Sequence, residues 1–228
     1  MRITHYASGS AANAIQVDNV LIDAGVKVDA KFDTLLITHA HIDHIRHLKH
    51  ALERCVTFYT PERVLTSIKE KMQKWGNKSR NEALALMEEK YQEPERIVAF
   101  DLKHDIPCVG YLVHGEYVHM SDTGVIDVPD FIKNKTFLTI ESNYDYYELL
   151  TSGRSQELIE RIQKTHMSNE QALNLAKQIN PQAAMFVHLS TETNSPDLAK
   201  AAHSLIKHEF ETYYPEAEEE ILVEIKKP

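Results

Sequence analysis

Three histidines and one aspartate lie within a stretch of six residues, and this stretch constrains the fold and chemistry of the chain most. His39, His41, Asp43 and His44 directly follow an apolar run at 35–37 that predicts a buried strand. Residues two apart in an extended chain point the same way, so we expect His39 and His41 to hold one ion together. Asp43 and His44 then face a neighbouring position. Because imidazole and carboxylate are the usual ligands of zinc and similar metals, the pattern predicts a metal site at a strand end.

The alternative interpretation is a histidine-rich surface loop. The chain has 13 histidines, so some are incidental, and we expect this of His47 and His50. A surface loop gives no reason for ligand-type residues at alternating positions behind a buried strand, and the metal site is therefore favoured.

Length and composition predict a single domain over residues 1–228, because 228 residues with 43% hydrophobic content can form one large core. The N-terminus lacks the pattern of a secretory signal, and no apolar run approaches membrane-spanning length. Cys55 and Cys108 are not in CxxC spacing and fit reduced thiols. We therefore expect a cytoplasmic protein that does not enter a membrane.

The formal net charge of −9 argues against broad binding of duplex nucleic acid, although two divalent ions would offset about four charges locally. One segment is basic and includes Trp75; its cations are Lys69, Lys71, Lys74, Lys78 and Arg80. This segment is either a local nucleic-acid patch or a solvated helix face. The acidic run at 218–220 is expected to be a solvated turn before a final strand at 221–225.

Periodicity and turn residues predict a mixed α+β fold. Short strands are expected first and strands alternating with helices later, which favours sheets covered by helices. The expected strands are 3–7, 14–17, 20–22, 34–38, 57–60, 97–100, 110–114, 117–120, 137–140 and 183–188. The expected helices are 61–91, with a break near Gly76, then 156–164, 169–178 and 196–210.

Three further ligand-type residues follow predicted strands. His104 follows 97–100, Asp122 follows 117–120, and His188 ends 183–188. Each alone is weak, but together they complete a shell for two metals. His39, His41 and His104 would hold the first ion. Asp43, His44 and His188 would hold the second, and Asp122 would bridge the two.

With these residues, the chain resembles the metallo-β-lactamase superfamily over nearly its whole length. The HxHxDH stretch and the later order His, Asp, His match that family's metal motifs. The closer resemblance is to the YycJ (WalJ)-type proteins, which are similar to tRNase Z and the PhnP-type phosphodiesterases. That branch is matched by five short segments: 7–10 with Asn13, 121–124, 141–143, 165–169 and 188–190. The resemblance implies a four-layer αββα sandwich and an intracellular metal-dependent hydrolase.

The implied activity is hydrolysis of phosphodiester bonds by a hydroxide that bridges two divalent ions, with zinc expected and manganese as the alternative. The substrate would be a nucleic acid, cleaved by a nuclease, or a small nucleotide. The acidic charge favours a cyclic-nucleotide phosphodiesterase as one alternative. A second alternative is a metal-stabilised binding protein without turnover.

The resemblance also assigns further residues. Asp23 matches the aspartate that supports the metal loop, and His166 is expected to protonate the leaving group, with a helix-start role as its alternative. Asp43 and Asp122 are ligands that also act in catalysis by orienting the nucleophile. Substrate contacts are expected from Ser8, Ser10, Asn13, Asn143 and His166.

Three positions depart from the branch pattern. Tyr144 stands where a histidine is usual, Thr165 replaces a glycine, and His47 replaces the glycine after the metal loop. The family also suggests a homodimer, with an apolar stripe in segment 61–91 as a candidate interface; the stripe could instead pack on its own domain. Its members are Val64, Leu65, Ile68, Met72 and Trp75.

Overall fold

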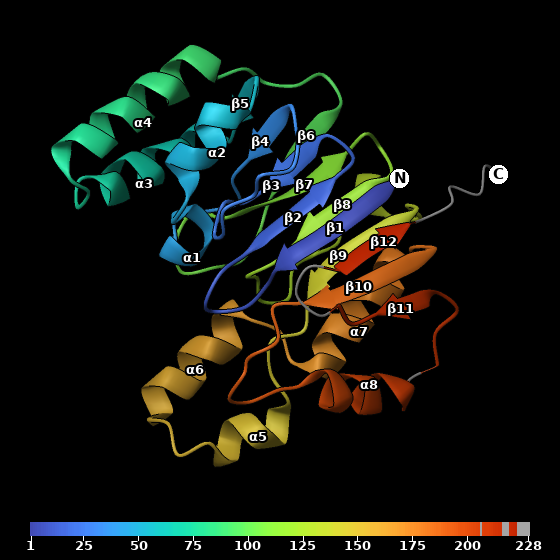
Figure 1. The fold of residues 1–228 in the computed structure, drawn as a ribbon. Helices are drawn as coiled ribbons and strands as arrows, with labels where there is room; N and C mark the ends of the chain where they lie inside the picture. The colour runs from blue at the N-terminus through green and yellow to red at the C-terminus, as the bar shows by residue number, and fades with distance from the viewer. Residues whose placement is uncertain (206, 216–218, 223–228) are drawn as a thin grey trace. The chain divides into compact units, whose positions relative to one another are not determined.

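The computed structural model describes residues 1–205, 207–215 and 219–222 (Figure 1). These residues form two compact units. The first unit comprises residues 1–99 and the C-terminal residues from 216 onward, and the second comprises 100–215. The expectation of a single domain stays a prediction, and each unit is described by itself.

The first unit is built on a six-stranded sheet with the order β12-β1-β2-β3-β4-β5. Its strands are β1 (Arg2–Ala7), β2 (Ala14–Val17), β3 (Val20–Ile22), β4 (Thr34–Leu36), β5 (Thr57–Tyr59) and β12 (Glu219–Leu222). The pairs from β12 to β3 are antiparallel, whereas β3, β4 and β5 run parallel. Ile22 lies opposite Leu36, so β3 and β4 end at the same edge of the sheet. Apart from the half-buried Thr34 that begins β4, both strands are apolar and buried, as their sequences predict.

Four helices complete the first unit: α1 (Ile42–Ile45), α2 (Leu48–Arg54), α3 (Glu62–Met72) and α4 (Asn77–Lys90). The predicted break at Gly76 separates α3 from α4, with Gly76 at the N-cap of α4. Lys90 ties α4 to the end of α2 by donating from Nζ to the carbonyls of Leu52 (2.6 Å) and Cys55 (2.7 Å).

The apolar stripe of α3 is buried inside the first unit. Val64, Leu65, Ile68 and Met72 are all buried, and Trp75 is half-buried. The stripe therefore packs on its own unit, which is the second of the two interpretations given above. It does not offer a free apolar interface. The homodimer itself stays a prediction.

The second sheet has the order β11-β10-β9-β8-β7-β6. Its strands are β6 (Ile97–Asp101), β7 (Val109–Val113), β8 (Tyr117–Met120), β9 (Phe137–Glu141), β10 (Ala183–Val187) and β11 (Glu211–Tyr213). β8, β9, β10 and β11 run parallel. β7 to β10 are buried along their whole length, as expected for strands covered on both faces.

The helices of the second unit are the 3-10 turn η1 (Asp130–Ile132), α5 (Tyr146–Thr151), α6 (Gln156–Thr165), α7 (Asn169–Ile179) and α8 (Pro196–Ser204). α7 begins with a capping box, in which Ser168 and Gln171 each bond the other's backbone N–H. Ser155 and Ser195 cap α6 and α8 through their hydroxyls. These caps fix the helix starts that the sequence predicts.

Several predicted boundaries are wrong. The helix expected at 196–210 ends at Ser204, and β11 follows it. The acidic run is not a turn throughout, because Glu219 and Glu220 belong to β12 and pair with His5 and Thr4 of β1. Glu218, residue 206 and the predicted strand residues 223–225 lie outside the described residues. α5 was not predicted at all.

Among the described residues, no helix combines the length and apolar character that crossing a lipid bilayer requires.

Candidate metal centre

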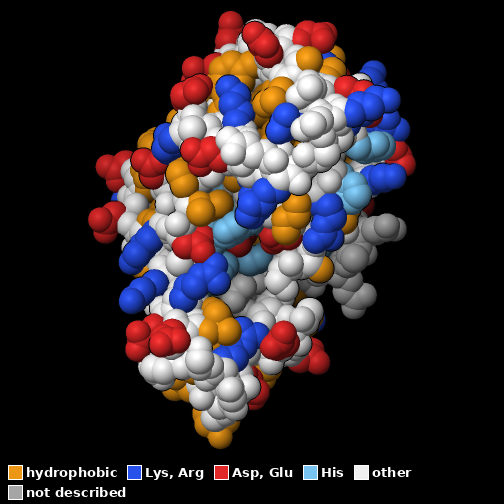
Figure 2. Space-filling view, turned by 90° about the vertical axis from the view of Figure 1, so that its left-hand side faces the viewer, with side chains coloured by type: hydrophobic (Ala, Val, Ile, Leu, Met, Phe, Trp, Pro, Cys, Tyr) orange, Lys and Arg blue, Asp and Glu red, His pale blue; other side chains and the backbone are white. Residues whose placement is uncertain are grey.

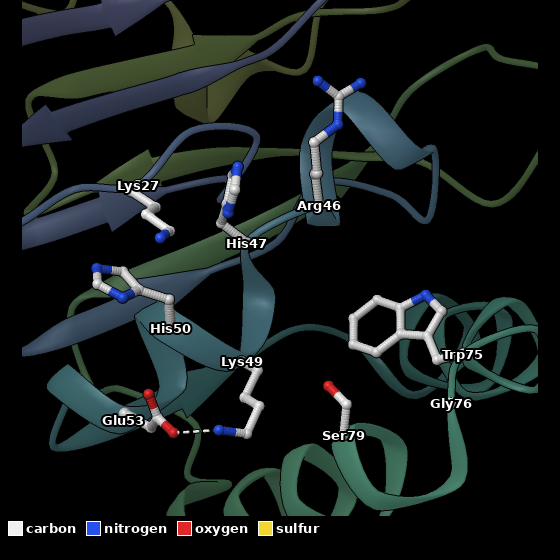
Figure 3. A pocket seen from close by; sticks show the side chains of 9 residues that line it. All are labelled: Lys27, Arg46, His47, Lys49, His50, Glu53, Trp75, Gly76 and Ser79. Carbon is white, nitrogen blue, oxygen red and sulfur yellow. Dashed lines mark hydrogen bonds and ion pairs between the residues drawn. The ribbon is translucent and has the colours of Figure 1, made fainter.

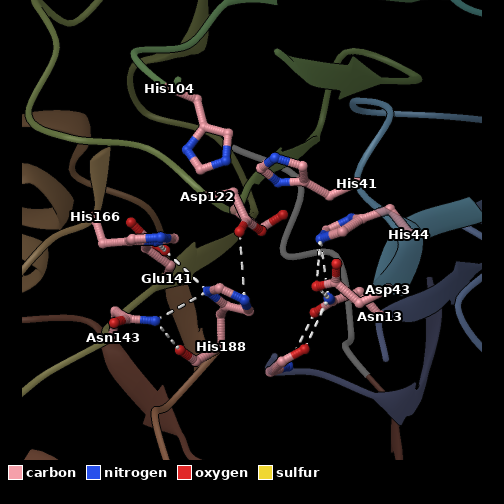
Figure 4. Close-up of polar contacts among 12 residues, drawn as sticks. Asn13, His41, Asp43, His44, His104, Asp122, Glu141, Asn143, His166 and His188 are labelled. Atoms are coloured by element: carbon pink, nitrogen blue, oxygen red, sulfur yellow. Dashed lines mark hydrogen bonds and ion pairs between the residues drawn. The ribbon is translucent and has the colours of Figure 1, made fainter. Parts of the chain in front are cut away.

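The HxHxDH stretch leaves the end of β4 and turns into α1, where its side chains converge (Figure 4). His39 Nε2 lies 3.1 Å from His41 Nδ1, so the two imidazoles turn ring nitrogens toward one another. His44 Nε2 lies 3.4 Å from Asp43 Oδ2. His39 and His41 are therefore close to one another within the first unit, as are Asp43 and His44, while their binding of metal ions stays a prediction.

A buried carboxylate, Asp23, supports this stretch from the end of β3. Its oxygens accept from the Thr38 amide (2.8 Å) and hydroxyl (2.8 Å) and from His44 Nδ1 (2.7 Å). Thr38 Oγ1 in turn lies 3.0 Å from His39 Nδ1. Asp23 thus orients His44 directly and His39 through Thr38, which is the supporting role that the resemblance implied.

Asn13 and Gly25 also contact the HxHxDH stretch or one another through backbone hydrogen bonds. The backbone N–H of Asn13 donates to Asp43 O (2.8 Å), and Gly25 N–H donates to Asn13 O (2.8 Å). A Cβ at Gly25 would lie 1.9 Å from Asp43 O, so only glycine fits there. Asn13 Nδ2 lies 3.0 Å from Asp43 Oδ2 and 2.9 Å from His44 Nε2. Asn13 therefore contacts predicted ligands, whereas its substrate role stays a prediction.

The two predicted substrate serines differ in surroundings. Ser8 Oγ lies 2.9 Å from His5 Nε2, while Ser10 is exposed. Their roles toward substrate are not tested by these contacts.

In the second unit, three neighbouring parallel strands bring their ends together. Met120 of β8 lies opposite Ile140 of β9, and Glu141 lies opposite Val187 of β10. Asp122 and His188 follow these strands, so Asp122, Glu141 and His188 meet at one edge of the sheet. His188 Nε2 lies 3.4 Å from Asp122 Oδ1.

Glu141 is the centre of this group (Figure 4). It is fully buried, and its Oε1 accepts from the amides of Thr123 and Met167, both at 3.0 Å. Its Oε2 accepts from His166 Nδ1 (3.0 Å) and His188 Nδ1 (3.1 Å). Asp122, Glu141, His166 and His188 each offer a ligand-type atom, and these atoms lie within 4.8 Å of one another.

This arrangement favours a protonated His166. Burial by itself lowers the pKa of His166, but the charge and hydrogen bond of Glu141, with a further contribution from Asp122, raise it overall to about 9. Burial would raise the pKa of Glu141, but the charge and hydrogen bonds of His166 and His188 lower it overall. The pair is therefore a carboxylate and an imidazolium at neutral pH.

The remaining predicted residues of the second unit also lie near this edge. His104 Nδ1 donates to the Thr165 carbonyl (3.2 Å). Thr165 is the residue that stands where the branch pattern usually has glycine. Asn143 Nδ2 lies 3.2 Å from His188 Nδ1 and donates to its carbonyl (3.0 Å). Tyr144 is buried, and its hydroxyl donates to Gln171 (3.4 Å).

The residues fit divalent metals. In His39, His44, His104 and His188, Nδ1 contacts a protein oxygen, which presents Nε2 as the metal-binding nitrogen. Two of these oxygens belong to buried carboxylates, the usual outer partners of metal-bound histidine.

In addition, Asp23, Asp122 and His188 follow strands with φ of 64°, 53° and 57°. Left-handed backbone is uncommon among non-glycine residues, although aspartate and histidine adopt it more often than most, and Asp18 and His114 share it elsewhere in the chain.

Glu141 is the residue of this group that the sequence pattern did not single out. It was part of a matched segment but received no role. A signal existed, because an acidic residue ends a mostly apolar strand, 137–141. A buried acid at such a position needs partners, and only the folded unit shows that they are His166 and His188.

The sequence model described as Beta-lactamase superfamily domain matches residues 18–189 of the chain. No curated protein matches the sequence. Among solved structures, the metallo-beta-lactamase fold protein YhfI from Bacillus subtilis is similar, with 16% identity, a TM-score of 0.68, and coverage of 96% of this chain and 98% of that chain.

Two other solved structures are also similar. Human tRNase Z, short form, has 17% identity and a TM-score of 0.63, covering 99% of this chain and 100% of its own. A diphosphatase from the PhnP family has 13% identity and a TM-score of 0.61, covering 98% of both chains. The α+β fold with two sheets and flanking helices is thus the metallo-β-lactamase fold, which confirms the predicted fold class.

Proposed function

The chain belongs to the beta-lactamase superfamily domain family, and from this premise we propose that it is a metal-dependent hydrolase of phosphodiester bonds. The family and its structural neighbours support a hydrolase as the general class. Phosphodiester chemistry is our proposal, supported by the residues beside the ligand set and by the likeness to a tRNase Z and a PhnP-family diphosphatase.

We propose that the chain holds two divalent ions. His39, His41 and His104 would hold one ion and Asp43, His44 and His188 the other, with Asp122 shared. The mixture of imidazole and carboxylate suits zinc best and manganese second. When bound, such ions supply an activated water at neutral pH and stabilise negative charge on a phosphoryl group.

The observation that carries the proposal is the Glu141 carboxylate, which accepts from both His166 and His188. Glu141 orients one predicted ligand, His188, and keeps a second imidazole, His166, protonated. A proton held on His166 is useful when the leaving group is an alkoxide of high basicity, as in a phosphodiester. His166 would give this proton to the leaving oxygen, and Glu141 would stabilise the imidazolium until then.

The other side chains have supporting roles in this proposal. Asp43 and Asp122 bind the ions, and whichever is held less tightly orients the attacking water. Asn13 and Asn143 position His44 and His188 through the contacts described above. Ser8 and Ser10 would face the phosphate.

The test is turnover of bis(p-nitrophenyl) phosphate by protein loaded with zinc or manganese, with metal content measured by elemental analysis. We expect close to two ions per chain and hydrolysis that stops on chelation. Bound metal without turnover of any phosphodiester would support the alternative, a metal-stabilised binding protein. Protein that takes up no metal on reconstitution would contradict both.

A cyclic-nucleotide phosphodiesterase is the second candidate, favoured by the net charge of −9. Comparing hydrolysis of a labelled single-stranded oligonucleotide with that of cyclic mononucleotides separates the two substrates.

Two further properties complete the proposal. A cytoplasmic location is supported by two buried cysteines that carry reduced thiols. A homodimer is an expectation from the family, and light scattering at micromolar concentration tests it.

A further inference from the structure

A pocket of about 490 Å³ opens in the first unit between the start of α2 and the turn that joins α3 to α4. We call it the Trp75 pocket. Lys27, Arg46 and His50 line it, and the indole of Trp75 lies across it from Lys27 and His50 (Figure 3). It contains none of the predicted metal ligands.

The pocket carries positive charge that its own acids do not neutralise. Lys49 is paired with Glu53 and, at 3.2 Å, with Glu82, so this cation is compensated. Within the part of the chain that the structure describes, Lys27 and Arg46 have exposed side chains and form no ion pair. The space-filling view shows a gathering of Lys, Arg and His side chains at its upper right (Figure 2).

The positive charge of the pocket also acts on His47, which is one of its lining residues. Burial, followed by the charges of Lys27, Arg46 and His50, lowers the pKa of its imidazole, and no acid opposes them. His47 stands where the branch usually has glycine after the metal loop. Its φ of −111° is open to any residue, so the backbone did not require glycine here. This departure from the branch places an aromatic, hydrogen-bonding ring in the pocket.

Trp75 adds an aromatic face to this charge. It is the only tryptophan of the chain, and it is half-buried while the rest of the α3 stripe is buried. Lys74 and Lys78 beside it are exposed, which continues the basic segment that the sequence revealed. Cations that track phosphates, combined with an aromatic ring on which a base stacks, are the two components of single-stranded nucleic-acid sites.

The pocket also adjoins the metal loop along the chain. His44 is buried at the end of α1, and Arg46 is exposed two residues later. A predicted metal ligand in α1 is therefore buried, while a pocket cation at the C-cap of the same helix is exposed.

We propose that the Trp75 pocket binds a single-stranded segment of a nucleic-acid substrate, with phosphates at Lys27 and Arg46 and a base stacked on Trp75. This inference rests on the proposed phosphodiester chemistry and narrows its substrate to a polymer. The net charge of −9 does not argue against such a substrate, because positive charge is concentrated at the pocket.

Fluorescence tests the proposal, since the sole tryptophan reports on the pocket alone. Metal-loaded protein is titrated with an oligothymidylate about ten nucleotides long, a length within the range of known single-strand sites. Electrophoresis afterwards checks that the strand is intact. We expect quenching by the oligonucleotide and at least about tenfold weaker binding of a cyclic mononucleotide.

Variants locate the binding. Lys27→Gln combined with Arg46→Gln should weaken binding of a labelled oligonucleotide at least about tenfold and flatten its salt dependence by about 1.4 in log–log slope, about 0.7 for each lost phosphate contact. Trp75→Ala should weaken binding by about tenfold or more, and Trp75→Phe should retain most of it. The matched control is Lys177→Gln with Lys207→Gln, which removes two exposed lysines that line a different hollow, in the second unit.

The outcomes separate this inference from the proposed function. Turnover of bis(p-nitrophenyl) phosphate without quenching by the oligonucleotide overturns the pocket and leaves the hydrolase standing. Quenching that the Lys27 and Arg46 variant abolishes, without turnover of any phosphodiester, supports the pocket and overturns the hydrolase. Equal weakening by the control variant, or equal affinity for the cyclic mononucleotide, also overturns the pocket.

Discussion

The two units bring their ligand-type residues together in opposite ways. In the first, His39, His41, Asp43 and His44 follow one another along a single turn after β4. In the second, ligand-type residues come from separate places in the chain and meet because β8, β9 and β10 run parallel. The first group can be recognised from local spacing, whereas the second exists only through strand register.

The supporting carboxylates show the same contrast. Asp23 contacts one predicted ligand directly and a second through Thr38. Glu141 contacts one predicted ligand, His188, and one predicted proton donor, His166. We infer that the first unit provides metal binding alone, while the second combines metal binding with proton transfer.

The largest expected effect comes from Asp122→Ala, which removes the one residue assigned to both ions. Turnover should fall by more than the roughly 10²–10⁴-fold typical of a lost proton donor, because both metal positions lose a ligand. Elemental analysis should show metal loss, with the fold retained by circular dichroism. Asp127→Ala, an exposed acid of the same unit, is the control. A variant that turns over at near wild-type rate would show that Asp122 does not bridge.

The next effect is that of His166→Gln, which tests the proton-transfer role of the second unit. Metal content should be kept, and turnover of a nucleotide should fall by roughly 10²–10⁴-fold. The loss should be much smaller with p-nitrophenolate as the leaving group, which needs little protonation. His208→Gln serves as control. Equal losses on both substrates, or loss of metal, would argue for a structural His166.

Acid should weaken the second unit through His203, which is buried between α8 and α7. Its Nε2 donates to Asn169 O (3.0 Å) and its Nδ1 accepts from Tyr214 Oη (2.6 Å), so the ring is neutral. Burial lowers the pKa of His203 from 6.5 to about 4. Below pH 6.5 the unfolded state therefore binds the proton that the folded state refuses, and stability falls with pH until about pH 4.

By linkage, this shift removes about 2 kcal/mol of unfolding free energy between pH 7 and pH 5. Urea titrations at the two pH values measure it, with His203→Gln as the comparison. The variant should lose less stability over this interval than the wild type. An identical pH dependence in both proteins would remove His203 as the cause.

The smallest effect is expected for Asp23→Asn and Glu141→Gln, which remove the negative charges of the two supporting carboxylates. Each should weaken metal affinity by about 10–100-fold, measured by competition with a chelator. At saturating metal, Asp23→Asn should recover most of its turnover. Glu141→Gln should not, because His166 loses the negative charge that keeps it protonated. Equal recovery of both variants would erase the proposed difference between the two units.

The sequence by itself determined the candidate ligand stretch and most regular elements. Strand spans such as Ala14–Val17 and Tyr117–Met120 match their predictions, because alternation and turn residues are local signals. The break at Gly76 and the helix starts at Gln156, Asn169 and Pro196 were also predicted, since the caps lie in the sequence itself. The HxHxDH stretch could be recognised from its own spacing, without reference to residues elsewhere in the chain.

Only the tertiary structure decided what depends on distant residues. The role of Glu141 required β9 to lie between β8 and β10, and the burial of the α3 stripe required the rest of its unit. β11 is a short, partly exposed edge strand, and its pairing with β10 defines it. The Trp75 pocket likewise gathers Lys27, Arg46 and Trp75 from three separate segments. Spacing along a chain specifies local conformation, whereas the meeting of distant side chains depends on strand register and packing.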